Sequence, residues 1–96
     1  MAITINKNVP VFDTDIIKRG DVIRIRRATD TTLRNGIVTR VEPNQMQILF
    51  SNVQNTATSF LHVEAADVEI GVWEIWWTTD FVTINYHPAA SGGGNA

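Results

Sequence analysis

The chain has 96 residues, of which 44% are hydrophobic, 19% are charged and none is cysteine. This length fits a single domain with a modest core, and the lack of cysteine excludes disulfides, thiolate nucleophiles and cysteine-based metal sites. Apolar runs are much shorter than the roughly 20 residues of a membrane helix, and the first residues show no signal-peptide pattern. We therefore expect a cytoplasmic globular domain.

The charge is divided along the chain. Residues 1–40 hold all eight basic residues and four acidic ones, a balance of +4, whereas residues 41–96 hold six acidic and no basic residues. Basic and acidic strands side by side would explain this division through cross-strand pairs. A basic face could instead dock on the acidic face of another copy, or bind nucleic-acid phosphates. The overall negative charge makes nucleic acid the weakest of these three interpretations.

The first 20 residues predict an extension rather than part of the main sheet. Residues 3–5 and 9–12 are extended, and Pro10 restricts the second segment to an edge strand or an arm. Residues 13–20 have an acidic start, a basic end and a final glycine, which predicts one turn of helix.

Strands are expected at 21–28, 36–41, 45–50, 57–64, 72–78 and 81–86, because these segments are rich in β-branched or aromatic residues and most alternate in polarity. Asn35-Gly36 and residues 42–45 are typical of turns, and 51–59 include a polar loop. Residues 65–71 predict a short helical turn. The Gly-rich segment 88–96 predicts a flexible tail.

Short strands separated by turn residues favour an all-β fold, specifically a small SH3-like barrel over about residues 19–78. A five-stranded OB-like barrel is the alternative. The expected organisation is an N-terminal arm and helical turn at 1–18, a barrel domain at 19–87 and a tail at 88–96.

Three segments, IIKRGDVIRIRR, RNGIVTRV and ADVEIGVWEIWW, resemble a small uncharacterised family of Gram-positive bacteria and their prophages. Its members share a KRGD strand opener, a G-I-V-T strand and an ending around W-E-I-x-W. The likeness extends over residues 12–80. It implies a role in the virion or its assembly, with a location in the host cytoplasm and then in the particle, and it implies no enzymatic activity.

Catalytic and metal chemistry find little support in the sequence. His62 and His87 lack the convergent ligands that a metal site needs, and no phosphate-binding or dinucleotide-binding glycine motif is present. The acidic residues from Glu64 to Glu74 are typical of a solvated face. We expect no enzyme, cofactor, metal, small-molecule substrate or membrane partner.

Trp76 is the strongest candidate for a contact residue. Alternation places Trp73, Ile75 and Trp77 in the core and puts Trp76 with Glu74 on the polar side of the same strand. The N-terminal arm, through Val11 and Phe12, or the last strand could cover Trp76. An exposed Trp76 would instead mark a partner site, because tryptophan is enriched at binding hot spots.

Arg24 and Arg26 share one strand face, and Arg40 on the next strand is expected to join them. Pairing with acidic residues on a neighbouring strand is the simpler interpretation. These arginines would carry the alternative function of a nucleic-acid-binding barrel. A small enzyme or an inhibitor of a host protein is a third class.

The favoured hypothesis is a non-catalytic phage or prophage structural protein that binds copies of itself or another virion protein. Its expected contact residues are Trp76, Glu74, Arg24, Arg26, Arg40, Val11 and Phe12.

Overall fold

The structure, a computed structural model, describes residues 2–51 and 58–90. Within them the chain forms a hairpin of β1 (Thr4–Lys7) and β2 (Val9–Phe12), then β3 (Val22–Arg27), β4 (Arg34–Val41), β5 (Gln45–Ser51) and β6 (Thr58–Glu64). Helix α1 (Ala65–Glu69), β7 (Trp73–Thr78) and β8 (Asn85–His87) follow. The protein is therefore all-β with one short helix in its described part, as the sequence predicts.

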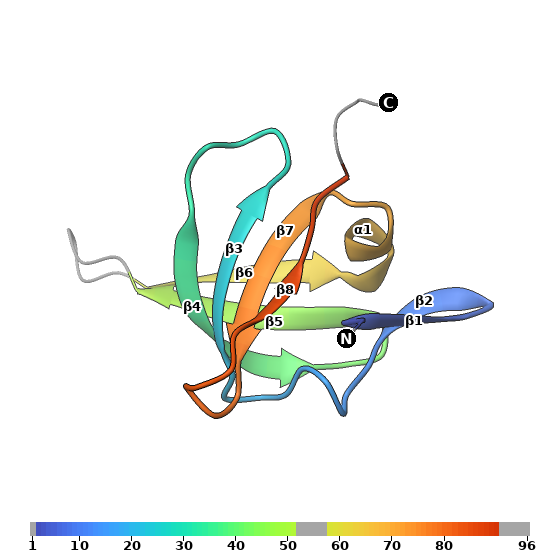
Figure 1. The fold of residues 1–96 in the computed structure, drawn as a ribbon, viewed down its shortest axis with the longest axis horizontal. Helices are drawn as coiled ribbons and strands as arrows, with labels where there is room; N and C mark the ends of the chain where they lie inside the picture. Colours follow the sequence, from blue (N-terminus) through green and yellow to red (C-terminus); the bar gives the residue numbers. More distant parts are fainter. Residues whose placement is uncertain (1, 52–57, 91–96) are drawn as a thin grey trace.

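The main sheet is antiparallel, with strand order β6-β5-β4-β3-β7-β8. It curves strongly, so that β5 and β6 cross the direction of β3 and β7 (Figure 1). The curve encloses one apolar core of mostly alternating residues, which include Ile23 and Ile25 of β3, Ile48 of β5 and Ile75 of β7. Alternation thus gives the sheet a core face and an outer face, the first packed and the second turned to solvent.

The hairpin β1–β2 is part of this core rather than a detached arm. Ile3 and Phe12 are buried in the same cluster as the sheet residues. The Phe12 backbone N–H donates to the Pro43 carbonyl at 2.7 Å, and the Thr4 hydroxyl donates to the Glu69 carboxylate at 2.7 Å. The prediction that Phe12 forms part of a contact surface is therefore wrong, because its side chain fills the core.

Residues 13–20 begin with a single helical turn, as predicted, which does not continue into a helix. The Ile16 and Ile17 amides both donate to the Asp13 carbonyl at 3.0 Å, while the Asp13 carboxylate accepts from the Asp15 amide at 3.0 Å. This side-chain bond favours a turn over a continued helix. Gly20, with φ of +95°, ends the segment as predicted.

Asn35 and Gly36 lie inside β4, although their sequence is typical of a turn. Gly36 pairs with Phe50 of β5, and a Cβ atom at this position would collide with the Leu49 carbonyl oxygen. Glycine is therefore required here by the close approach of two strands rather than by a turn.

Asp21, just before β3, is a buried carboxylate with a structural role. It accepts hydrogen bonds from the Lys18 amide at 3.0 Å and the Thr79 hydroxyl at 2.9 Å. Its own carbonyl accepts from the Val38 amide at 2.9 Å. These bonds tie the first turn, β4 and the end of β7 together, as a buried charge requires.

The C-terminal segment departs from prediction in two places. The expected strand at 81–86 is only β8, because residues 79–84 form an irregular loop. Residues up to Ala90 are anchored, since the Ala90 amide donates to the Gly71 carbonyl at 3.0 Å. The rest of the predicted tail, 91–96, and most of the predicted polar loop, at 52–57, lie outside the described residues.

Candidate protein-interaction face

An apolar row crosses the outer face of the main sheet. The strand register places Val22, Ile37, Leu49 and Phe60 opposite one another on four consecutive strands, β3, β4, β5 and β6. We call these four residues the apolar band. Ile37 and Phe60 are 48% and 55% exposed. Cross-strand partners lie within side-chain contact distance, so the band is a continuous apolar surface where a solvated sheet face is normally polar.

The loop between β7 and β8, residues 79–84, presents further exposed apolar side chains, one of which, Ile84, lines a groove together with Val22 of the band. It protrudes at the end of β7 (Figure 1). Phe81 is 71% exposed and Val82 83%, and Ile84 is also exposed. Exposed apolar side chains gathered in one place are typical of protein-binding surfaces, whereas single ones are ordinary.

The backbone of this loop is held in a specific shape. The Asp80 carboxylate accepts from the amides of Val82 and Thr83 at 2.8 Å each, and the Phe81 amide donates to the Thr78 hydroxyl at 3.0 Å. Phe81 has φ of +64°, a conformation that a bulky L-residue rarely adopts. The amide bonds to Asp80 lower the pKa of its carboxyl group. Hydrogen bonds and a disfavoured backbone conformation therefore hold the loop in a shape that exposes the Phe81 side chain to solvent.

A groove of about 260 Å³ connects the loop to the sheet. Its walls include Trp76 of β7 and Ile84 of the loop, and its floor includes Val22 of the apolar band. Trp76 is half-buried, because Tyr86 of β8 lies against it with ring centroids 5.2 Å apart. The last strand thus covers one side of Trp76, while the groove leaves the other side accessible.

Glu74 and Arg26 form a cross-strand ion pair beside Trp76. The register puts them opposite each other on β7 and β3, and the guanidinium donates to the carboxylate. The Tyr86 hydroxyl donates to the same carboxylate. The bond from Tyr86, together with the Arg26 guanidinium, lowers the pKa of Glu74. The same bond and the negative charge of Glu74 raise the pKa of Tyr86. Internal pairing is therefore the role of Arg26 and Glu74, as the simplest view of the divided charge predicts.

Of the three arginines expected to share a surface, Arg24 and Arg26 lie two residues apart on the outer side of β3, as predicted, but Arg40 does not lie beside them. Arg24 is opposite Asn35 on β4 and donates to its side-chain oxygen at 2.9 Å. Arg40 is five residues further along β4, beyond an irregularity between Val38 and Arg40. The register therefore separates Arg40 from Arg24 and Arg26, the two other residues on which the nucleic-acid alternative depended.

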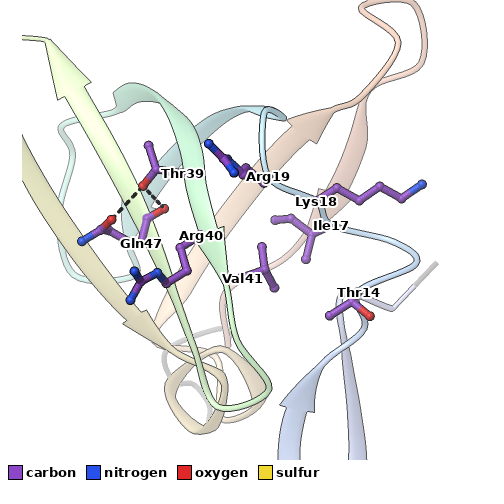
Figure 2. Close-up of a pocket in the computed structure, with 8 residues that line it drawn as sticks. All are labelled: Thr14, Ile17, Lys18, Arg19, Thr39, Arg40, Val41 and Gln47. Atoms are coloured by element: carbon purple, nitrogen blue, oxygen red, sulfur yellow. Dashed lines mark hydrogen bonds between the residues drawn. The ribbon is translucent and has the colours of Figure 1, made fainter.

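Arg40 instead borders a pocket of about 500 Å³ near the first turn (Figure 2). It faces this pocket from β4 together with Thr39, whose hydroxyl donates to the Gln47 side chain at 3.0 Å. Lys18 and Arg19 reach the same pocket from the turn before β3. An Arg40 nitrogen lies 4.0 Å from a Glu42 carboxylate oxygen, and both side chains are largely exposed.

The sequence identified part of this face and missed its main component. It placed Trp76 and Glu74 on the outer side of β7, which the structure confirms. It missed the apolar band, although Ile37 and Leu49 stand at alternating positions where polar residues are expected. Val11 is half-buried in β2, on the hairpin rather than on this face.

A family model matches residues 3–84, which is most of the chain. The chain belongs to the DUF5026 family. This family is described as a domain of unknown function, so membership supports the resemblance to an uncharacterised family without giving an activity. No curated protein and no solved structure matches the chain.

Two further observations concern metal-binding groups and membrane-spanning helices. In residues 2–51 and 58–90, no three His, Cys, Asp or Glu side chains are gathered as a metal site requires. No helix in the described part of the chain is long and apolar enough to span a bilayer.

Proposed function

We propose that this chain is a non-catalytic structural protein that assembles with further copies of itself through its outer face. The observation that carries the proposal is the exposure of large apolar side chains in the band and, at Phe81 and Val82, in the β7–β8 loop. The resemblance to a prophage-associated family supplies the setting, a virion or its assembly. The SH3-like barrel belongs to the same proposal, supported by the order and curvature of the strands.

The shape of the loop favours a binding role over a purely structural one. Phe81 adopts a disfavoured backbone conformation and yet contributes little to the core, because most of its side chain faces solvent. Local strain of this kind costs of order 1–3 kcal/mol and is concentrated at functional sites. A buried contact with a second copy would give the exposed ring a role that the single chain does not provide.

The distribution of charge agrees with an apolar contact. Arg26 and Glu74 neutralise each other within the chain, and Arg24 is held by Asn35. Of these two arginines on the outer side of β3, Arg26 is thus neutralised within the chain, whereas Arg24 is positioned by a neutral partner. Association through this face should therefore depend on burial of apolar surface, which high salt does not weaken, rather than on opposite charges, which salt screens.

Light scattering coupled to size-exclusion chromatography tests the proposal. The chain should form a discrete oligomer that persists at high salt. Phe81→Asn should weaken association about tenfold or more, the loss expected for one hot-spot aromatic side chain. Folding should be preserved, because asparagine tolerates positive φ.

Ile70→Ser is the matched control, because Ile70 is also a large exposed apolar residue but lies after α1, away from the outer face. This variant should associate like the original chain. Monomers at every concentration and salt, or equal losses in both variants, would contradict the proposal.

A further inference from the structure

A second, polar pocket of about 260 Å³ lies where β3 ends and β4 begins. Its apolar walls come from the core side of the sheet, through Ile25, Leu61 and Trp73. The remaining lining is polar and mostly basic: Arg26, Arg27, Asp30, Thr32 and Arg34. This pocket therefore differs from the apolar outer face, and its basic lining favours a polar, negatively charged ligand.

Two guanidinium groups at this pocket are positioned by aromatic rings. Arg27 lies over the ring of Trp73, 4.7 Å from its centroid, and Arg34 lies 5.7 Å from the ring centroid of Phe50. The two arginines occupy adjacent antiparallel strands, since Arg34 is opposite Ile25. Cation–π contact restrains each guanidinium while leaving its N–H donors at the ring edge available.

These two arginines have no anionic partner among residues 2–51 and 58–90. Neither has a carboxylate within 4.0 Å there, whereas Arg26 at the same pocket is paired with Glu74. Asp30 is the acidic residue of the lining, and its carboxylate accepts from the Thr31 amide at 3.0 Å. The pocket thus keeps two fixed positive charges that no described carboxylate neutralises.

Trp73 lines the same pocket and serves as a reporter of it. Its side chain is only 6% exposed, and the Arg27 guanidinium lies over its ring. Its indole Nε1 is buried, so the guanidinium groups are the donors that a ligand in the pocket would meet. A pocket that offers guanidinium donors with few acceptors matches a ligand made of oxygen acceptors.

We propose that this pocket binds a small oxyanion, a carboxylate or a phosphate group, through Arg27 and Arg34, and that the Trp73 ring beneath Arg27 senses the binding. Planar guanidinium groups bind both anions in a bidentate manner. The small volume suits one such group and few attached atoms. This site does not depend on the outer face, so either proposal can fail without the other.

Nuclear magnetic resonance of the ¹⁵N-labelled full chain tests the proposal. Sodium phosphate and sodium acetate are added separately at constant ionic strength, with chloride as the balancing anion. The Trp73 indole N–H signal should shift saturably with one or both anions. The Trp77 indole, which donates to the Ile16 carbonyl at 3.0 Å, is an internal control whose signal should stay in place.

Substitutions then locate the site. Arg27→Gln and Arg34→Gln should each weaken binding about tenfold or more, since hydrogen bonds to charged groups contribute about 1.5–3 kcal/mol. Arg24→Gln removes one positive charge on the outer face and should leave binding unchanged. Saturation by phosphate alone would identify a phosphate group, and by acetate alone a carboxylate. No saturable shift with either anion, or equal losses in all three variants, would overturn the proposal.

Discussion

The ion pair of Arg26 and Glu74 is a residue-scale contribution to stability that depends on pH. The folded state lowers the pKa of Glu74 through the bonds from Tyr86 and Arg26. The stabilisation is therefore fully present above the ordinary glutamate pKa, and it is lost as the pH falls through the lower, folded-state pKa. Glu74→Gln should reduce the free energy of unfolding by about 1 kcal/mol at neutral pH, a modest value because Arg26 is 34% exposed.

Urea unfolding at neutral pH and at about pH 3 checks this prediction, because an ordinary glutamate is mostly protonated at the lower pH. The difference between the two proteins should shrink in acid. Glu42→Gln is the matched control, since Glu42 and Arg40 are 4.0 Å apart and largely exposed. Its effect should stay within about 0.5 kcal/mol. A Glu74→Gln penalty that is the same at both pH values would refute the linkage.

Single-residue exposure was predictable only where strand alternation was regular. The sequence placed Trp73 and Trp77 in the core and Trp76 outside, because β7 has no irregularity. Arg40 was expected beside Arg24, but the register shift between Val38 and Arg40 and the length of β4 separate them. Strand register depends on pairing with β5, which no property of β4 alone reveals.

At the scale of elements, the β7–β8 loop depends on one carboxylate. Asp80→Ala removes the acceptor for the amides of Val82 and Thr83, so these amides should exchange with solvent faster while β7 keeps its protection. Protonation of the Asp80 carboxylate should likewise speed exchange of these amides. The pKa of Asp80 is lowered, so the loop should hold its shape above the ordinary aspartate pKa and loosen as the pH falls through the lower, folded-state pKa.

Amide hydrogen exchange followed by nuclear magnetic resonance measures this effect. Asp80→Asn is the matched control, because the asparagine side chain keeps an oxygen that accepts from both amides. It should retain most of the protection. Equal exchange in Asp80→Ala and the original chain would show that the loop is shaped by other contacts.

The same carboxylate explains why an element was mispredicted. Residues 81–86 alternate and contain β-branched side chains, which is typical of a strand. Asp80 instead captures the amides of residues 82 and 83, so that pairing with β7 begins only at Asn85. Most of the other strands were predicted to within two residues, because their alternation and their turn residues agree.

At the scale of the whole molecule, the basic first part and the acidic second part of the chain neutralise each other only partly through internal ion pairs. The basic strand β3 lies against the acidic strand β7, and this contact contains the Arg26–Glu74 pair. Among the basic side chains that the structure describes, the exposed ones fall in three places: Arg24 on the outer face, Arg27 and Arg34 at the pocket where β3 ends and β4 begins, and Lys18, Arg19 and Arg40 around the larger pocket. The strand order that separates them could not be derived from the sequence, because it is set by long-range pairing.

The N-terminal hairpin should unfold together with the main sheet, although its sequence suggested a separate arm. Phe12 is only 3% exposed and packs in the same core as β3, β5 and β7. Phe12→Ala should therefore cost about 3–5 kcal/mol and lower the melting temperature by about 10–20 °C or more in a domain of this size.

Thermal unfolding followed by circular dichroism should show this loss as a single shifted transition. Val9→Ala in the same strand is the control, because Val9 is 60% exposed and its truncation should change the stability by at most about 0.5 kcal/mol. If Phe12→Ala left the transition in place, the hairpin would be an independent arm. A large shift makes it a structural part of the domain, since the buried ring then supports the same core on which the outer face and both pockets are built.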